Sequence, residues 1–318
     1  MIRIDVLIPL YNAELFISQT IESVFKQTYT DWHLVILEDR STDNSYQEAK
    51  KWADRYPEKV SLFRNETNLG MLGNWNKGIG LCKSPFFVKL DADDLWENTF
   101  LEECMAVLEK EPSIGLTFSK YVNINEKNEI IANSEITLPD FAKDKAFSCK
   151  DLVLQGQNKM LAYPILRQGL GIMRREIFEV VGLYRHLLTP ETQASTDTEF
   201  YFRLGAHYNI YCIDKTLYRY RIHQNSISST DSQQQLGAQK LYETKMTILN
   251  YYYEKGNISR HFYAQNRNQV DTIYLFSQQY YARLCKNYKL LTKLLAKLIL
   301  FYPLETLKIV LKKIKQYE

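Results

Sequence analysis

Short apolar runs alternate with amphipathic stretches through the first third of the chain, and this alternation limits the possible folds more than any other feature of the sequence. It predicts strands at residues 2–9, 32–37, 60–63 and 85–90, the first ended by Pro9, and helices at 13–26, 45–56, 72–82 and 99–108. Strands that alternate with helices of this length form right-handed βαβ units, in which helices cover both faces of a mostly parallel sheet. The sequence therefore predicts an α/β fold with a Rossmann-like sheet.

Ligands of such a sheet bind at the carboxyl ends of its strands, so the loops after the four strands are the candidate site. In the first loop, Pro9 and Asn12 lie on either side of Tyr11, whose ring could stack on a flat base. In the second loop, Asp39 could accept a hydrogen bond from the imide N–H of a base. Each of these residues also has an ordinary alternative role, because aromatic rings pack in cores and carboxylates cap helices.

The next helix and the third loop carry further polar side chains. Asp43 or Ser45 is expected to cap the helix that follows the second strand. After the third strand come Asn68, Gly70 and, within the next helical pattern, Asn76. A glycine in this region permits a positive φ and the close approach of a ligand, although it also occurs in ordinary turns.

An acidic cluster follows the fourth strand, where Asp91, Ala92, Asp93 and Asp94 end the apolar run 86–90. Three carboxylates at the end of a buried strand repel one another unless a cation neutralises them. Mg²⁺ and Mn²⁺ take carboxylate and phosphate oxygens, so the cluster predicts a metal–diphosphate clamp. We expect Asp93 to bind the metal and Asp91 to contact the ribose or the metal shell. All four loops then suit one ligand, a uridine-type diphosphate with its metal ion.

Five segments, read in order, resemble the motifs of family 2 inverting glycosyltransferases with the GT-A fold: VLIPLYN (6–12), EDRSTD (38–43), NLG (68–70), NWNKG (74–78) and LDADD (90–94). The resemblance extends from about residue 4 to residue 228. Glu38 replaces the usual Asp, and Arg40 stands where glycine is common, so the turn is expected to differ and Arg40 to lean toward the nucleotide. The resemblance implies that a nucleotide sugar is bound by Pro9, Tyr11, Asn12, Asp39, Asn68, Gly70, Asn76, Asp91, Ala92 and Arg221.

Two later segments, STDTEFYFRL (195–204) and YRYRIHQNSIS (218–228), also resemble segments of this family. An inverting transfer needs a base for the acceptor hydroxyl and a cation for the leaving diphosphate. Asp197 matches the position of the usual base, with Glu199 as the second candidate, unless Asp197 only caps a helix. Arg221 and His223 could both face the diphosphate, with His223 as a metal ligand or as a phosphate contact.

The composition is that of a folded soluble protein in which charge is unevenly distributed. From residue 283 onward the chain has nine Lys or Arg and two Glu, so this segment has a net charge of +7. The whole chain has a net charge of +3, so the residues before 283 together carry −4. The first residues lack an apolar signal region, and no apolar run is long enough to span a bilayer. Five scattered cysteines without a C-x-x-C pair predict reduced packing thiols.

Past residue 228 the resemblance ends, and helices are expected at 236–253 and 261–281. Lysines recur every four residues from Lys289, and a second apolar stripe begins at Leu304 after Pro303, which predicts two basic amphipathic helices. These helices either lie on an anionic membrane or pack in a bundle with their lysines in water. We expect a GT-A domain over 1–230, divided into a nucleotide-binding half (1–119) and an acceptor half (120–230), and a helical region over 231–318.

These features predict a glycosyltransferase that moves a sugar from a UDP-sugar, with inversion and with Mn²⁺ or Mg²⁺, to a hydroxyl of a growing surface glycan on a lipid-linked or lipooligosaccharide acceptor. We expect a cytoplasmic protein with peripheral contact of residues 283–318 to the inner face of the cell membrane and no nucleic-acid partner. A homo-oligomer is one option, and the sequence leaves the oligomeric state open. A pyrophosphorylase would need a G-x-G-x-R loop after the first strand, where Pro9 and Tyr11 stand instead. A processive synthase would need membrane spans and a Q-x-x-R-W motif, and the sequence has neither. A non-catalytic sugar-nucleotide-binding protein remains the alternative, although it has no need for a base.

Overall fold

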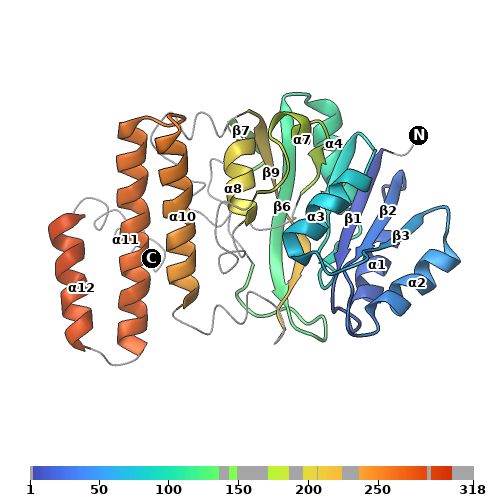
Figure 1. The fold of residues 1–318 in the computed structure, drawn as a ribbon, viewed down its shortest axis with the longest axis horizontal. Helices are drawn as coiled ribbons and strands as arrows, with labels where there is room; N and C mark the ends of the chain where they lie inside the picture. The colour runs from blue at the N-terminus through green and yellow to red at the C-terminus, as the bar shows by residue number, and fades with distance from the viewer. Residues whose placement is uncertain are drawn as a thin grey trace. The chain divides into compact units, whose positions relative to one another are not determined.

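The computed structural model describes residues 3–135, 143–148, 171–185, 196–205, 207–223, 236–284 and 288–302 (Figure 1). These residues belong to two compact units. The first unit holds the described residues up to His223, and the second holds the described helices from Leu236 onward. The expected boundary at residue 230 lies outside the described residues.

The first unit is a single mixed sheet with helices. Its strands run in the order β3-β2-β1-β4-β8-β6-β9-β5, with β7 paired to β9. The strands are β1 (Ile4–Leu10), β2 (Trp32–Glu38), β3 (Val60–Arg64), β4 (Phe86–Lys89), β5 (Leu95–Trp96), β6 (Ile114–Ile124), β7 (Lys145–Ser148), β8 (Met173–Arg174) and β9 (Asn209–Arg221). The helices are α1 (Ile17–Phe25), α2 (Ser45–Arg55), α3 (Gly70–Leu81), α4 (Phe100–Lys110), α7 (Ile177–Val180) and α8 (Thr196–Leu204).

The four strands and four helices expected in residues 2–108 are confirmed, each within a few residues of its predicted bounds. Strands β3, β2, β1 and β4 pair in parallel, as βαβ units require. The rest of the sheet is mixed: β6 and β9 pair in parallel, while β5, β7 and β8 join it antiparallel. The expected division at residues 119 and 120 falls inside β6, so both halves share one sheet.

The first strand does not end at Pro9 as expected, but continues to Leu10. The carbonyl of Leu10 accepts a hydrogen bond from the N–H of Asp39, so the backbone polar groups of Leu10 point toward β2. Successive residues of a strand point these groups to opposite sides, so those of Pro9 point toward β4. Pairing with β4 ends at Leu7 and Lys89, two residues earlier. Proline is tolerated here because its missing N–H lies beyond the last rung of that ladder.

The core of this unit lies around β1, whose residues Ile4, Val6, Leu7, Ile8 and Leu10 are all fully buried. Helix α3 packs especially close to this strand, since a Cβ added at Gly78 would lie 2.6 Å from a Leu7 methyl carbon. This glycine thus brings a helix against the sheet rather than admitting a ligand. Three cysteines of the described residues, Cys82, Cys104 and Cys212, are buried and unpaired, and burial raises the pKa of each thiol.

The second unit contains helices α10 (Leu236–Glu254), α11 (Arg260–Leu284) and α12 (Tyr288–Phe301), with α11 in contact with both others (Figure 1). Asp271 of α11 joins them, because it accepts hydrogen bonds from the hydroxyls of Tyr242 at 2.8 Å and Tyr302 at 2.9 Å. Burial and these bonds to the carboxylate raise the pKa of both phenols to about 12, so both stay protonated donors at neutral pH.

Helix α12 is amphipathic as expected, with Leu294 and Leu298 buried and its lysines exposed. The second expected basic helix, after Pro303, lies outside the described residues. Among the described helices none is both long enough and apolar enough to cross a bilayer.

We predict that Asp5→Asn destabilises the first unit by about 1–3 kcal/mol at neutral pH, because a buried, hydrogen-bonded carboxylate is lost. Asp5 accepts the backbone N–H groups of Lys83 at 2.5 Å and Ser84 at 2.7 Å and lies 3.5 Å from His33. Burial alone would raise the pKa of Asp5, but the bonds from His33, Ser84 and Lys83 together lower it.

A group whose pKa is lowered by folding stabilises the folded state at any pH above its unfolded pKa. This contribution to the free energy of unfolding is lost as the pH falls through the folded pKa. The difference in free energy of unfolding between the wild type and Asp5→Asn, measured with urea, should therefore be largest at neutral pH. It should shrink as the pH falls below 3.8, the ordinary pKa of Asp. Exposed Asp54→Asn is the control. A difference that does not change with pH would contradict the assignment.

Candidate active site

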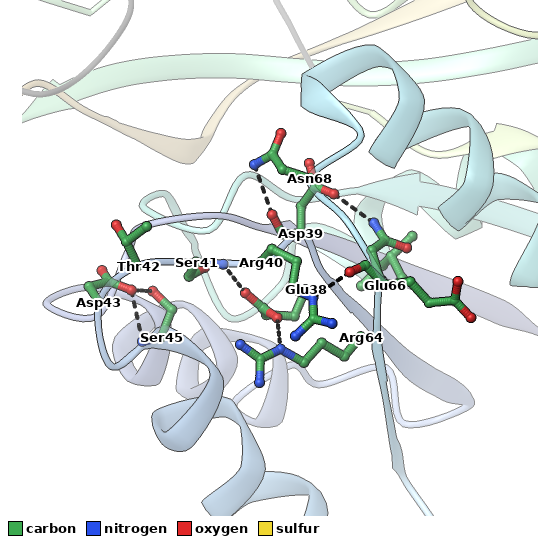
Figure 2. Close-up of polar contacts among 12 residues, drawn as sticks. Glu38, Asp39, Arg40, Ser41, Thr42, Asp43, Ser45, Arg64, Glu66 and Asn68 are labelled. Atoms are coloured by element: carbon green, nitrogen blue, oxygen red, sulfur yellow. Dashed lines mark hydrogen bonds and ion pairs between the residues drawn. The ribbon is translucent and has the colours of Figure 1, made fainter.

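The second loop of the site is built around a buried carboxylate (Figure 2). Glu38 is fully buried at the end of β2, where one oxygen accepts the backbone N–H of Ser41 and the other lies 2.7 Å from Arg64 Nε. These two contacts curl the loop and hold it against β3. An aspartate, one methylene shorter, would have to reach the same partners from a different backbone position.

Arg40 adopts φ +60°, the left-handed conformation that favours glycine. The turn is thus kept by an arginine, at a cost of about 1–2 kcal/mol. Its Nε donates to the carbonyl of Glu66 at 2.8 Å, which ties the second loop to the third (Figure 2). In this structure the guanidinium therefore contacts the protein's own backbone, where a lean toward the nucleotide was expected.

Asp39 organises the third loop. It is buried, and its Oδ1 accepts hydrogen bonds from Asn65 Nδ2 at 2.7 Å and from the N–H of Leu69 at 2.8 Å. Its carbonyl accepts the side-chain amide of Asn68 at 2.9 Å (Figure 2). Gly70 follows at φ +71°, which confirms the expected positive φ and lets helix α3 begin there. Asp39, Asn68 and Gly70 are therefore brought together as one assembly.

The first loop is fastened to the second by Asn12. Its N–H donates to Ser41 Oγ at 3.1 Å, and its side-chain oxygen accepts the N–H of Thr42 at 2.8 Å. Its neighbour Tyr11 is 49% exposed, so the ring is open to a stacking partner. The N-cap residue of α2 is Asn44, whose side chain makes no capping hydrogen bond, where Asp43 or Ser45 was expected as the cap. Asp43 Oδ1 accepts the N–H of Ser45, the first residue of the helix, at 2.9 Å (Figure 2).

The acidic cluster divides into members with different partners. Asp91 forms an ion pair with Lys89, whose buried ammonium lies 4.1 Å from the centre of the Trp75 ring. The carbonyl of Ala92 accepts the hydroxyl of Thr20 at 2.9 Å. Asp93 Oδ2 lies 2.9 Å from His223 Nε2, so the structure unites the two residues that the sequence proposed as metal ligands.

Asp94 is the buried anchor of this cluster. It is inaccessible to solvent and accepts the hydroxyl of Tyr218 at 2.6 Å and the N–H of Arg221 at 2.7 Å. Burial, together with the nearby charges of Asp93 and Asp91, raises its pKa well above the ordinary value. The chain thus concentrates negative charge at this edge of the sheet, where a bound cation would relieve the repulsion.

The side chains present fit a hard divalent cation. No group of three or more His, Cys, Asp and Glu in the described residues is arranged to hold a metal by itself. Asp93 and His223 nevertheless converge, and Mg²⁺ is commonly bound by one or two carboxylates while substrate phosphates complete its shell. Asp93 and His223 would therefore hold Mn²⁺ or Mg²⁺ together with a diphosphate.

Three predicted site residues are placed against the protein itself. Asn76 exchanges two hydrogen bonds with the backbone of Tyr184, at 2.9 and 3.1 Å. The guanidinium of Arg221 is buried and donates to the carbonyl of Asp93 at 2.6 Å and to that of Asn125 at 3.1 Å. Glu199 forms a buried ion pair with Arg203 at 2.6 Å. These contacts give all three a supporting role, whatever else they touch.

Asp197 is the second residue of α8, which begins at Thr196, so the expected position at the start of a helix is confirmed. The helix dipole favours an anion at that position. The side chain of Asp197 lies outside the described part of the structure.

Several site residues were missed by the sequence analysis. Lys89 is a charged residue inside the apolar run that precedes the acidic cluster. A lysine in an otherwise apolar strand needs a partner, and this feature of the sequence could have indicated its role. Asn65 joins Asp39 to Asn74, whose side-chain oxygen it contacts at 2.9 Å. Phe16, whose ring lies 4.9 Å from that of His223, carried no signal, because its position depends on how α1 packs.

Comparison with known proteins agrees with this geometry. The sequence model of "Glycosyl transferase family 2" matches residues 5–182, more than half of the chain, and the chain belongs to this family. It is a glycosyltransferase. The relative "UDP-Glc:alpha-D-GlcNAc-diphosphoundecaprenol beta-1,3-glucosyltransferase WfgD" from Escherichia coli is 30% identical over 154 residues, 48% of this chain and 59% of that protein. The match thus spans less than two thirds of that relative.

Two solved structures are similar in fold. TarS 1-349 of S. aureus in complex with UDP-GlcNAc has a TM-score of 0.60 at 17% identity, over 89% of this chain and 74% of TarS. The mannosyltransferase PcManGT of Pyrobaculum calidifontis in complex with GDP-Man and Mn²⁺ has a TM-score of 0.60 at 16% identity, over 99% of this chain and 80% of PcManGT. The expected GT-A fold is confirmed.

We predict that Asn76→Ala lowers the free energy of unfolding by about 1–3 kcal/mol, because the backbone N–H and carbonyl of Tyr184 lose their partners. Affinity for UDP should change less than twofold. Urea unfolding and titration calorimetry measure the two effects, with exposed Asn98→Ala as the control. A large loss of UDP affinity with unchanged stability would contradict this prediction and indicate that Asn76 binds the nucleotide directly.

Proposed function

We propose that this protein transfers a sugar, with inversion at the anomeric carbon, from a UDP-sugar to a hydroxyl of a growing surface glycan. The observation that carries the proposal is the convergence of Asp93 and His223, 2.9 Å apart, beside the interlocked loops of the first three strands. Membership of glycosyl transferase family 2 supports the reaction class. The UDP-sugar complex of TarS and the UDP-glucose named for WfgD support uridine as the nucleotide.

The donor is bound by the three loops that hydrogen bonds fasten together. Tyr11, half exposed, stacks on the uracil, with Pro9 and Asn12 shaping its loop. Asp39 already uses Oδ1 for Asn65 and Leu69, so Oδ2 accepts the imide N–H of the base. Asn68 and Gly70 complete this wall.

The diphosphate lies at the acidic cluster. Asp93 and His223 would hold Mn²⁺ or Mg²⁺, and the ion would supply positive charge for the leaving diphosphate. Asp91 and Ala92 line the ribose side of the same loop, and the ion pair with Lys89 holds the Asp91 carboxylate in place. Arg221 supports this loop from behind through its bond to the Asp93 carbonyl.

The acceptor is activated by Asp197 at the start of α8. The carboxylate takes the proton of the acceptor hydroxyl, the oxygen forms a bond to the anomeric carbon, and the bond from that carbon to the β-phosphate oxygen breaks. UDP then leaves with the electron pair of that bond. Glu199 is the weaker candidate for the base, because its buried carboxylate is already engaged by Arg203 on the same helix.

We predict that Asp93→Asn abolishes metal-dependent release of UDP, whereas Asp197→Asn lowers kcat by about 10²–10⁴-fold and leaves the Kd of UDP unchanged. The measurement is UDP release from a panel of UDP-sugars with Mn²⁺ and with EDTA. Glu199→Gln is the matched variant on the same helix, and its unfolding is measured beside its turnover, because the buried pair with Arg203 is broken.

The outcomes separate the alternatives. Full turnover by Asp197→Asn would remove it as the base and leave Glu199 as the candidate. Binding of a UDP-sugar by the wild type, with no release of UDP for any donor or acceptor, would favour a non-catalytic sugar-nucleotide-binding protein. No binding of UDP by calorimetry would overturn the choice of nucleotide.

We further propose that α12 contacts the membrane that carries a lipid-linked acceptor. Its last turn exposes apolar side chains, Ile299 by 63%, Leu300 by 73% and Phe301 by 68%, and Lys293 and Lys297 are exposed on the same helix. Apolar area and positive charge on one helix together favour an anionic bilayer. The acceptor named for WfgD, a diphosphoundecaprenol-linked sugar, supports such a location.

We predict that the double variant Leu300→Ser, Phe301→Ser weakens binding to anionic vesicles at least tenfold without lowering the thermal unfolding temperature, because both side chains face solvent. Vesicle co-sedimentation measures the binding, with exposed Leu15→Ser as the control. Unchanged sedimentation would contradict the contact.

A further inference from the structure

A cleft in the second unit is lined by none of the residues of the proposed transfer site. It has a volume of about 400 Å³ and runs along one face of α11. Helix α12, with 14 residues, is shorter than α11, with 25 residues, and ends beside Asp271 (Figure 1). The face of α11 between Arg260 and Asp271 therefore stays open next to the exposed apolar end of α12.

The cleft is lined for an anion. Arg260 and Arg267 lie two turns apart on α11, and both are exposed. Arg260 is also the first residue of the helix, whose first turn holds no acidic residue and whose positive end attracts anions. Among the residues that the structure describes, Arg260 has no carboxylate partner. Two guanidinium groups present forks of donors that suit phosphate oxygens.

The single acid of the cleft is already occupied. Asp271 accepts the hydroxyls of Tyr242 and Tyr302 and lies 3.8 Å from Arg267 Nε. Two arginines and one aspartate leave a net charge of +1 in the cleft. Tyr253 and Tyr263, stacked with their ring centres 4.5 Å apart, form an aromatic wall at the end near Arg260.

Charge also argues against the chain's own tail as the occupant. Residues 303–318 carry four lysines and two glutamates, a net charge of +2, which the two arginines would repel. An anion from outside the chain is the better match. Because the exposed Leu300 and Phe301 directly precede the Tyr302 that lines the cleft, an anion at a membrane surface is favoured over one in solution.

We propose that the cleft between Arg260 and Tyr302 binds the phosphate group of a lipid headgroup. This inference rests on the proposed membrane contact of α12 and not on the transfer chemistry. The apolar end of α12 enters the acyl region, while Arg260 and Arg267 grip the phosphate and the tyrosines pack against the headgroup. The protein would thereby choose phosphate-bearing lipids among anionic ones.

The test uses the full chain and two kinds of vesicle with the same surface charge. Phosphatidylcholine vesicles contain either phosphatidic acid or oleate, so that only the former adds an anionic phosphate. The wild type should bind the phosphatidic acid vesicles at least tenfold more tightly than the oleate vesicles. Arg260→Gln and Arg267→Gln should each reduce this preference severalfold, and the double variant should abolish it.

Matched variants keep the outcome interpretable. Arg55→Gln removes an exposed arginine that also lies against a tyrosine, 5.2 Å from the centre of the Tyr56 ring, and should change nothing. Leu300→Ser with Phe301→Ser should weaken binding to both vesicles and keep the preference. Release of UDP from a UDP-sugar should be unchanged in Arg260→Gln, so failure of the cleft and failure of the transfer reaction remain distinct.

Two results would overturn the proposal. The first is equal binding of the wild type to both vesicles, or a preference that survives in the Arg260→Gln, Arg267→Gln variant. The second is calorimetric binding of inorganic pyrophosphate that depends on both arginines while the vesicles show no preference, which would assign the cleft to a soluble phosphate compound. Circular dichroism of each variant confirms that the fold is retained.

Discussion

The burial of Asp94 is the constraint on which the site depends. Its carboxylate lies out of reach of solvent and is held by the Tyr218 hydroxyl and the Arg221 N–H, so the loop after β4 is fastened to the last residues of β9. Arg221 closes the connection by donating to the carbonyl of Asp93. Segments more than 120 residues apart in the chain thus meet at one point. His223, two residues beyond Arg221, is thereby carried to Asp93.

This arrangement stores electrostatic repulsion at the edge of the sheet. Asp91 and Asp93 lie close enough to Asp94 to raise its pKa; Asp91 pairs with Lys89, and Asp93 lies beside His223. Burying a charge is costly unless it is paired, so a bound cation would relieve the repulsion among these carboxylates.

In the second unit a carboxylate also connects separate elements, here the three helices. Its helices share Asp271, which gathers two tyrosine hydroxyls and leaves the two arginines of the cleft with one carboxylate between them. Polar bonds inside a helical unit specify one arrangement of its helices, because each misplaced helix would leave a buried oxygen without a donor. Within the described part of the chain, Ile299, Leu300 and Phe301 of α12 are exposed, while Leu294 and Leu298 are buried.

The sequence by itself determined the parallel half of the sheet, the order of its helices and the loops that carry polar chemistry, because hydrophobic periodicity and strand-end residues are local properties. It also indicated Asp93 and His223 as partners through the family resemblance. Only the tertiary structure decided that Asn76 and Arg221 contact the protein itself, since their partners lie on other elements. The pair of Glu199 with Arg203, by contrast, follows from a four-residue spacing on one helix that the sequence already carries.

The same reason explains the two local errors. Pro9 was expected to end β1, but whether its missing N–H matters depends on where the neighbouring strand stops pairing. Arg40 was expected to alter its turn, yet it holds the positive φ because Glu66, on another loop, accepts its guanidinium. Spacing along a chain reports which residues can act, whereas their partners are set by packing between distant segments, which no local pattern encodes.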